Sequence, residues 1–342
     1  MSGKGSFFII LFLLSFCLLN LTLQAQIRTP SGWYHKPRMV SPVRTIISKI
    51  HLELTPGYGH TIFLHKPEGL SVVSSAEHGV GLFSGAVTPD TIPALSQWFH
   101  RVEAGGFPAS STDFYIGADS TNLRMSGPSN SIPLNIGLYF VIDRFKIGGG
   151  FVFEPLLIGD FHATKYRREI GNWRPDIRLA FVKKYYGMIG ANIIRYNRWL
   201  VSADARIGLW NPGRKFDMAL IQKSLFYNVG GGVDYELSEY FHLYARPSLE
   251  FKSYTLSIPE TQTGIKHLAP AAYMQVGVVL RLPDMPKCFI KDCKTQIDHQ
   301  HGDKVYGSRV HPFWKKQNPN YGENYPTLIK YKRKNRKKLN PY

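Results

Sequence analysis

The clearest structural pattern in the chain lies in residues 225–254, LFYNVGGGVDYELSEYFHLYARPSLEFKSY. From 227 to 237, apolar residues recur at almost every second position, with asparagine, glycine and acidic residues between them. Residues 241–252 repeat this alternation, and Ser238-Glu239-Tyr240 separates the two halves. A period of two residues is that of a β-strand with one apolar and one polar face. The stretch therefore predicts two adjacent strands joined by a tight turn.

The same alternation recurs along most of the chain. With the two strands above, it predicts nine strands, which are 49–58, 132–142, 145–158, 176–183, 186–196, 199–210, 225–237, 241–254 and 271–282. Single-chain bacterial barrels have even strand numbers, so either one of the nine is misassigned or 60–65 is a tenth. We therefore expect eight or ten strands. After the N-terminal region, no segment is apolar for 18 residues, so no helical membrane span is predicted.

The first 25 residues are predicted to be a secretory signal peptide. Lys4 is the only charge before the apolar run 7–19, and Gln24-Ala25-Gln26 follows. A short basic start, an apolar run of this length and a small residue at the end are typical of a cleaved export signal. We expect cleavage after Ala25, then an N-terminal segment 26–45 and a barrel over 46–282. The barrel would contain a long loop at 66–130, whose side of the barrel the sequence leaves open.

Alternation alone does not distinguish a soluble barrel or sandwich from a transmembrane barrel, which turns its apolar face to lipid. The export signal, strands close to the 9–11 residues of a tilted membrane span, and aromatic residues near strand ends favour the membrane. The predicted fold class is all-β: an antiparallel up-and-down transmembrane β-barrel of 8–10 strands, with a basic and largely irregular C-terminal tail. Its expected location is the outer membrane of a Gram-negative bacterium, with outer-membrane lipid as a partner.

The signal sequence ending Leu-Gln-Ala-Gln, the strands rich in glycine and aromatic residues, and the basic tail together carry a resemblance. The chain resembles outer-membrane β-barrel proteins of the Bacteroidota type. The resemblance is one of overall pattern, covers most of the chain, and implies the same fold and location. It transfers no activity. The chain departs from that pattern at its C-terminus, because its last predicted strand is internal.

Charged residues fall on the polar face of the predicted strands, where a barrel would turn them inward. We predict an ion-pair network in the interior of the barrel, formed by Glu53, Asp204, Arg206, Asp234, Glu236, Arg246, Glu250 and Arg281. A barrel of about eight strands is filled by its own side chains, whereas an open porin needs about 16 strands. The interior is therefore expected to be packed, with no cofactor, no metal and no catalytic residue. Catalytic alternatives such as His51 with Glu53, His242 with Ser248 and Glu250, or His162 lack a spacing that places a nucleophile beside a base.

Two cysteines remain after the export signal with Cys17 is removed. Cys288 and Cys293 lie close together in an exported chain, which favours a local disulfide. The alternative is zinc, since His299 and His301 follow and complete a set of four nitrogen and sulfur ligands. The spacings match no common zinc site.

From residue 283 the alternation stops and a basic tail, 283–342, begins. The last 60 residues hold 14 Lys or Arg and 5 Asp or Glu. Its densest part is the candidate polyanion-binding run, formed by Lys330, Lys332, Arg333, Lys334, Arg336, Lys337 and Lys338. An exported chain meets no genome, so nucleic acid is not an expected partner, and peptidoglycan, lipid phosphates or periplasmic envelope proteins remain. The predicted function is a non-enzymatic outer-membrane barrel that acts as an envelope anchor or assembly component through this tail. The alternatives are a lipid-modifying enzyme of the outer membrane and an exported soluble ligand-binding barrel.

Overall fold

The computed structural model describes residues 42–307, apart from 68, 85–90, 109–113, 118–122, 197, 239, 260–263, 283–285, 294, 296–298 and 302–303. The predicted signal peptide and the basic run 330–338 lie outside the described residues. Among the helices of this part of the chain, none has the length and apolar character needed to cross a membrane.

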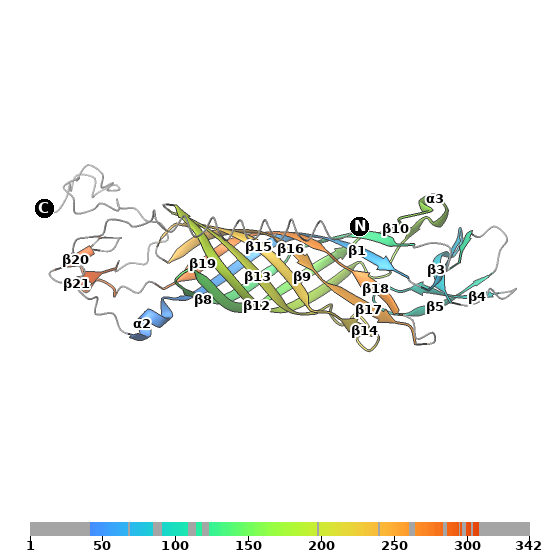
Figure 1. The fold of residues 1–342 in the computed structure, drawn as a ribbon, viewed down its shortest axis with the longest axis horizontal. Coiled ribbons are helices and arrows are strands. Elements are labelled where there is room, and N and C mark those ends of the chain that lie inside the picture. Colours follow the sequence, from blue (N-terminus) through green and yellow to red (C-terminus); the bar gives the residue numbers. More distant parts are fainter. Residues whose placement is uncertain are drawn as a thin grey trace, which may run out of the picture. The chain divides into compact units, whose positions relative to one another are not determined.

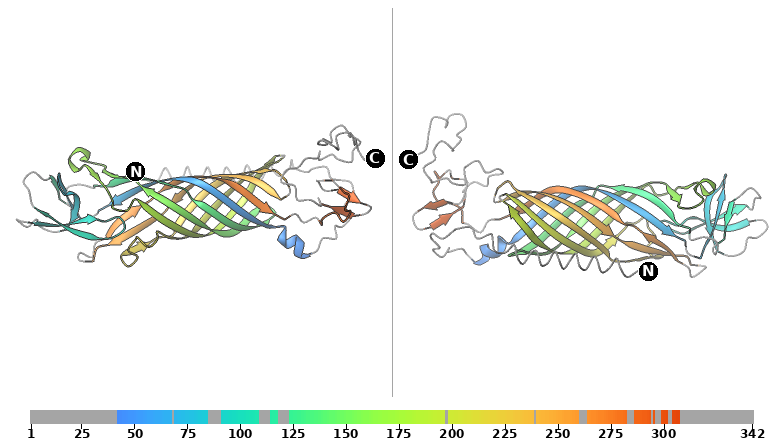
Figure 2. Two further views of the ribbon diagram at one scale, coloured as in Figure 1. Left: turned by 180° about the vertical axis from the view of Figure 1, so that it is seen from behind. Right: turned by 45° about the horizontal axis from the view of Figure 1, so that its top comes forward.

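Eight of the described strands close into a ring. They are β1 (Ile50–Lys66), β8 (Leu134–Ile142), β9 (Phe145–Ile158), β12 (Leu179–Tyr196), β13 (Trp199–Asn211), β15 (Phe226–Glu236), β16 (Phe241–Phe251) and β19 (Ala271–Arg281). Each pairs antiparallel with its neighbours in this order, and β19 pairs with β1 to close the ring. Figure 1 shows these strands crossing the barrel obliquely, and Figure 2 shows the same tilt from two further directions.

The ring corrects the strand count predicted from the sequence. The predicted strands 176–183 and 186–196 are one strand, β12, and the possible tenth strand at 60–65 is the continuation of β1. The period breaks in β12 because Lys183-Lys184-Tyr185-Tyr186 carries the same residue type on both faces: Lys184 and Tyr186 are buried while Lys183 and Tyr185 are exposed. The even number of ring strands agrees with the expectation of eight or ten.

With β12 read as one strand, the up-and-down connectivity is regular. Ile50 pairs with Phe140 and His51 pairs with Arg281, so the chain enters and leaves the ring at the same end. The short connections 143–144, 197–198 and 237–240 also lie at this end. In the first of them, Asp143 has φ of 51°, a conformation that Asp tolerates in tight turns. The longer connections 67–124, 159–178, 212–225 and 252–270 all leave the opposite end.

Shorter strands extend the sheet at the end with the long connections. They are β7 (Met125–Ser131), β10 (Phe161–Ala163), β11 (Asn172–Trp173), β14 (Ile221–Lys223), β17 (Ser253–Ser257) and β18 (Gly264–Leu268). β7 pairs with β1 and β9, and β18 pairs with β1, so the ladder continues past the ring itself. The predicted strand 132–142 begins instead at Leu134, after a break at Ile132-Pro133.

The predicted long loop 66–130 is folded in large part. It contains a five-stranded antiparallel sheet, formed by β2 (Ser71–Ser75), β3 (Gly79–Phe83), β4 (Thr91–Gln97), β5 (Glu103–Pro108) and β6 (Phe114–Ile116). These strands are short and rich in Ser, Thr and Gly, which hid their alternation. Because the insertion joins β1 to β7, it belongs to the end with the long connections.

The remaining described elements are small. They are helix α2 (Pro42–Ile47), helix α3 (Arg167–Ile170), and strands β20 (His299–His301) and β21 (Lys304–Tyr306), which pair with each other. The tail segment after β19 is thus not wholly irregular.

The ring is inverted relative to a soluble barrel, because its charged residues face inward. Glu53, Asp204 and Arg246 are buried, whereas Ile207 and Val229 are 46% and 59% exposed. Along β8, β13, β15 and β16, exposed aliphatic and aromatic residues alternate with buried residues, many of them polar. An apolar outer surface of this extent is what a barrel in lipid presents.

Candidate functional site

The interior of the ring holds a chain of ion pairs centred on Asp204. Its Oδ1 accepts hydrogen bonds from Nε of Arg206 at 3.1 Å and Nε of Arg246 at 3.0 Å. Arg206 also donates through Nη2 to Oε1 of Glu53 at 3.0 Å. Asn135 donates to the same Glu53 oxygen at 2.6 Å. Two arginines and two carboxylates from β1, β13 and β16, together with Asn135 of β8, are therefore joined in one network.

A second group of ion pairs is centred on Lys184. Its Nζ lies 2.7 Å from Oε2 of Glu154 and 2.6 Å from Oε1 of Glu250. Lys252 reaches the same Glu250 oxygen at 2.9 Å, and the hydroxyl of Tyr273 donates to Glu154 at 2.8 Å. Strands β9, β12, β16 and β19 are linked across the interior by these contacts.

The buried charges of the interior balance. A third pair, Lys146 and Asp234, lies at 3.7 Å, and Lys146 donates to Ser202 at 3.0 Å. Together the described ring buries five carboxylates and five Lys or Arg side chains. Buried charges are tolerated when each is paired and hydrogen-bonded, so this balance lets the barrel hold ten charges away from bulk water.

Two glycine positions make room for this network. A Cβ added at Gly230 would lie 2.7 Å from Cζ of Arg246, and one at Gly150 would lie 2.5 Å from the hydroxyl of Tyr186. The interior face of the glycine-rich strands is thus reserved for large side chains that come from neighbouring strands. A residue with a side chain at either position would displace them.

Little space is left between these side chains. A cavity of about 20 Å³ is lined by Lys184, Tyr186, Arg206, Arg246 and Glu250 among others. A volume of this size admits about one water molecule. The part of the interior lined by these side chains is therefore packed.

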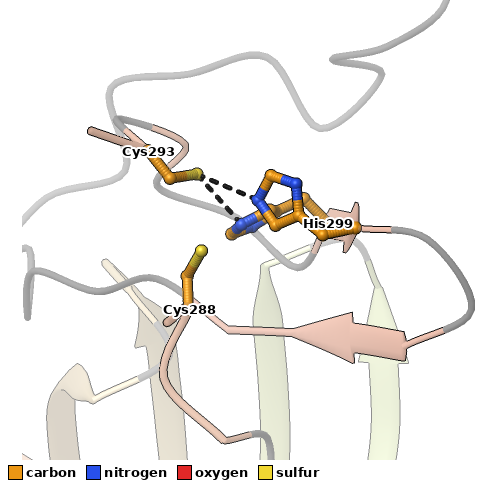
Figure 3. A group of neighbouring side chains, drawn as sticks. Cys288, Cys293 and His299 are labelled. Carbon is orange, nitrogen blue, oxygen red and sulfur yellow. Dashed lines mark hydrogen bonds between the residues drawn. The ribbon is translucent and has the colours of Figure 1, made fainter. Parts of the chain in front are cut away.

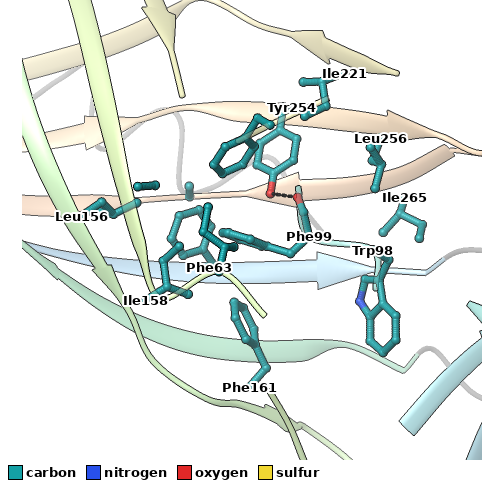
Figure 4. Close-up of a cluster of buried hydrophobic side chains, with 14 of the residues drawn as sticks. Phe63, Trp98, Phe99, Leu156, Ile158, Phe161, Ile221, Tyr254, Leu256 and Ile265 are labelled. Carbon is teal, nitrogen blue, oxygen red and sulfur yellow. Dashed lines mark hydrogen bonds between the residues drawn. The ribbon is translucent and has the colours of Figure 1, made fainter. Parts of the chain in front are cut away.

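An aromatic cluster fills the ring at the end with the long connections. Phe99 is fully buried, and its backbone carbonyl accepts a hydrogen bond from the hydroxyl of Tyr254 at 2.8 Å. The rings of Phe63 and Phe99 meet edge to face at 5.0 Å, and those of Trp98 and Trp173 stack at 3.9 Å. Figure 4 shows Phe99 among side chains from several strands of the barrel. Residues 98–100, which belong to the connection between β4 and β5, thus pack into the barrel end.

Two histidines lie within this aromatic cluster. His267 of β18 is buried, stacks on Tyr254 at 4.3 Å and meets the ring of His65 at 4.3 Å. Burial lowers the pKa of His267 to about 3, against the opposing effect of the Trp98 backbone. The imidazole is therefore neutral at physiological pH.

The structure brings most of the predicted interior residues together. Glu53, Asp204, Arg206 and Arg246 form the first network, Glu250 belongs to the second and Asp234 to the third. Glu236 and Arg281 pair with each other. Arg281 approaches Glu236 at 3.8 Å and Arg195 approaches it at 3.1 Å, near the end with the short turns.

Sequence reasoning missed several interior residues. Lys184 was hidden because two consecutive lysines conceal which of them faces inward. Asn135 and Tyr273 fall on the polar face of their predicted strands but were not assigned to the network, because asparagine and tyrosine occur on either face of a membrane strand. Tyr186 was missed because 186–196 alternates poorly. Trp210, expected among the aromatic residues at the membrane interface, is instead 5% exposed and donates to the Ser224 carbonyl at 3.0 Å.

Three of the weighed catalytic residues have other partners among the described residues. Glu250 is engaged by Lys184 and Lys252, and Ser248 accepts a hydrogen bond from Asn228 at 3.3 Å. His162 lies 2.5 Å from Asn172 at the end of the barrel with the long connections. His51 lies at the opposite end, with the short turns.

After β19, a group of cysteine and histidine side chains converges. The donor atoms of Cys288, Cys293, His299 and His301 all lie within 4.8 Å of one another. Sγ of Cys293 lies 3.1 Å from Nε2 of His299 and 3.4 Å from Nε2 of His301. Figure 3 shows the two sulfur atoms and the His299 ring pointing toward one another. The two cysteines, both described, are not joined in a disulfide, and the predicted disulfide between them stays a prediction.

Comparison with known proteins gives a distant likeness in fold. No protein-family model and no curated protein matches the chain. The outer-membrane protease OmpT of Escherichia coli matches at 10% identity and a TM-score of 0.30, over 69% of this chain and 97% of its own. The outer-membrane protein OprG of Pseudomonas aeruginosa matches at 9% identity and a TM-score of 0.31, over 69% of this chain and 96% of its own. The outer-membrane protein AlkL matches at 13% identity and a TM-score of 0.28, over 66% and 90%.

At these scores the matches carry no argument about function, and the barrel is assigned from its strand pairing and burial. The narrower resemblance to proteins of the Bacteroidota type stays a prediction. The described chain is an all-β antiparallel barrel with a distant structural resemblance to bacterial outer-membrane β-barrels.

Proposed function

We propose that this protein is a non-enzymatic outer-membrane barrel with a closed interior, which acts as an envelope anchor or assembly component through its basic tail. The observation that carries the membrane part is the inverted ring, with ten paired charges inside and apolar side chains outside. A soluble ligand-binding barrel would need the opposite arrangement, because exposed apolar surface of this extent drives association in water.

Strand length supports the same proposal. β13 has 13 residues and β9 has 14. At about 3.3 Å per residue and a tilt of about 40°, a strand of 13 residues rises about 33 Å along the barrel axis. The apolar band of an outer-membrane barrel is about 25 Å tall, so these strands are long enough to span it.

The packing of the interior favours an anchor over a pore. The ion-pair groups around Asp204 and Lys184 cross the lumen, and the aromatic cluster with Phe99 fills one end. Ring strands linked in this way resist relative motion, because each buried carboxylate holds cations from other strands. Such an interior suits a rigid support for the segments at its two ends.

The environment of the candidate catalytic groups favours a non-enzymatic role over a lipid-modifying one. Glu250 is neutralised by two lysines, and Ser248 has an amide as its hydrogen-bond partner where a catalytic serine would have a base. The function then belongs to the ends of the barrel. The tail leaves β19 at the end where the chain enters the ring, which is the periplasmic side for a barrel with short periplasmic turns.

The anchor role is tested by deleting residues 330–342, which removes the polyanion-binding candidates Lys330 to Lys338. We expect insertion of the barrel to be unchanged and co-sedimentation with peptidoglycan or envelope complexes to weaken. Since the attraction is electrostatic and the screening length is about 8 Å at physiological ionic strength, raising the salt should weaken retention of the full chain in the same way.

A matched control replaces the same thirteen residues by an uncharged Gly/Ser segment of equal length, which should behave like the deletion. Retention that neither salt nor deletion changes would contradict the anchor role. Cleavage of the tail by protease added to intact cells would contradict its periplasmic location.

A further inference from the structure

We propose that Cys288, Cys293, His299 and His301 bind one zinc ion. The site lies between the last barrel strand and the basic tail, and it is independent of the anchor role proposed above. Two thiolates and two imidazoles arranged tetrahedrally are a common ligand set for structural zinc. The ligand order, two cysteines followed by two histidines, is present although its spacing is unusual.

The backbone brings the four donors together. His299 and His301 are two residues apart on β20, so their side chains leave the strand on the same face. Lys287 forms a parallel bridge to Gly307, and the amide of Cys288 donates to the Gly307 carbonyl at 3.1 Å. This bridge fixes Cys288 beside the hairpin of β20 and β21.

A turn supplies the remaining ligand. The amide of Cys293 donates to the carbonyl of Ile290 at 3.2 Å, which folds the chain back after Cys288. As a result, Sγ of Cys293 faces both imidazoles of β20. The convergence thus depends on a bridge, a hairpin and a turn, and no single element produces it.

The distances between the donor atoms fit a zinc site whose ligands have not yet closed around the metal. With Zn–S of about 2.3 Å and Zn–N of about 2.0–2.1 Å, the donors of a tetrahedral site lie about 3.3–3.8 Å apart. The contacts of Cys293 with His299 and His301, at 3.1 and 3.4 Å, are already close to this range. The widest separation in the group is 4.8 Å, so a closing movement of about 1 Å completes the tetrahedron.

Zinc binding explains why all four side chains converge, whereas a disulfide would explain only the two cysteines. A disulfide between Cys288 and Cys293 would leave His299 and His301 directed at sulfur atoms that no longer bind them. Binding of zinc by two thiols releases two protons, and the divalent cation with two thiolates and two neutral imidazoles carries no net charge. That neutrality suits the buried position of Cys288.

The segment also needs a cross-link for its stability. β20 and β21 have three residues each, and an isolated two-stranded hairpin is marginal in water. Among the described side chains, Phe289 packs against Tyr306 at 5.3 Å and against His301 at 6.2 Å, while Phe289 stays 64% exposed. Small units without a sufficient core are commonly stabilised by a metal or a disulfide, and here the metal engages both the hairpin and the turn.

The test uses the full chain without an affinity tag, purified in detergent with a reductant and stripped by a chelator. After addition of Zn²⁺ and removal of the excess, metal content is measured by mass spectrometry of the digested protein. We expect one zinc per chain, and loss of that zinc in Cys293→Ser and in His299→Ala. Co²⁺ in place of Zn²⁺ should give the visible bands of a tetrahedral thiolate site, and Cys293→Ser should abolish them.

Two controls separate this site from other causes. His162→Ala removes a histidine that pairs with Asn172 and lies far in sequence from the four proposed ligands. This variant should keep the full zinc content. Heat-modifiable gel mobility of each variant shows whether the barrel is folded, so that zinc lost with a folded barrel supports the site.

Three results would overturn the proposal. Zinc that stays bound in both ligand variants would be bound elsewhere. A reduced wild-type chain that takes up no zinc would lack the site. Protein isolated without reductant whose mass is two hydrogens lower would hold the predicted disulfide instead.

Discussion

Two consecutive lysines of β12 face opposite sides of the barrel wall. Lys184 is buried between Glu154 and Glu250, whereas Lys183 is exposed on the outer surface. They are residues of the same type at adjacent positions of one strand, and they differ only in the face of the strand that they occupy. The pair therefore isolates the effect of the interior.

Lys184→Met should destabilise the barrel by about 3–5 kcal/mol, because removing one partner leaves two buried carboxylates close together. Lys183→Met should change stability by about 0–1 kcal/mol, as for charges near the membrane interface. The measurement is the free energy of unfolding in urea, with refolding into lipid vesicles. Equal effects for the two lysines would contradict the assignment of interior and outer faces.

Val229 tests the outer surface at the residue scale. It lies in the middle of β15 and is 59% exposed. Val229→Arg should cost about 2–4 kcal/mol if the position is near the bilayer midplane, and Val229→Leu should have little effect. The same unfolding measurement checks both. An arginine tolerated there as well as leucine would mean that this surface faces water.

Replacing Asp204 is expected to cost more stability than its position on the polar face alone suggests. Considered only as an interior residue, Asp204→Asn is expected to cost less than Val229→Arg, unless a tightly coupled ion pair is involved. The structure places its carboxylate between Arg206 and Arg246. We therefore expect its replacement to cost as much as that of Lys184, since buried Arg246 would lose its carboxylate partner and Arg206 would keep only Glu53.

At the scale of elements, the aromatic cluster joins β17, β18 and the connection between β4 and β5. His267 is neutral within it, with a pKa of about 3, while an unfolded histidine has a pKa of about 6.5. Above pH 6.5 the imidazole is neutral in both states and pH has no effect. Between pH 6.5 and 3 only the unfolded state takes up the proton, so the stability of the cluster falls as the pH falls.

The expected slope is about 1.4 kcal/mol per pH unit for this histidine. Hydrogen exchange at pH 7.5 and 5.0, corrected for intrinsic rates, should show protection falling in 98–100 and 264–268. His267→Gln should reduce this pH dependence, and His162→Gln should leave it unchanged. Because burial also lowers the pKa of His65, part of the dependence should remain. A dependence in His267→Gln as steep as in the unmodified chain would assign it to groups other than His267.

The elements also explain why strand assignment from sequence succeeded in some places and not in others. β15 and β19 were predicted almost to the residue because their alternation is strict. β16 begins at Phe241 as predicted but ends at Phe251, so the last residues of the predicted strand 241–254 belong to β17. β12 was divided because its inward and outward residues are of the same type. The sheet of β2–β6 was missed because short strands with small polar residues carry little periodic signal.

At the scale of the whole molecule, the even ring and its packed interior predict a membrane protein that does not conduct. The full chain should sediment with outer membranes and migrate faster on a gel before heating than after it. In planar bilayers it should give no steady channel conductance, because ion pairs cross the lumen and Phe99 with its neighbours fills one end. Folded protein found in the soluble periplasmic fraction without lipid or detergent would contradict the membrane assignment, and steady conductance would contradict the closed interior.

The features that could be predicted from the amino-acid sequence are those that follow from local strand geometry. A strand places alternate residues on opposite faces whatever its partners are, so alternation was enough to predict an all-β chain, most strand positions and a charged face including Glu53, Asp204 and Arg246. Tertiary structure confirmed that the charged face is inside, and it alone decided that the described ring has eight strands and that Lys184 meets Glu154 and Glu250. It also decided that Cys288 and Cys293 meet two histidines. These features depend on pairing between residues far apart in the chain and on which side of each strand is enclosed, and neither is encoded in a period of two.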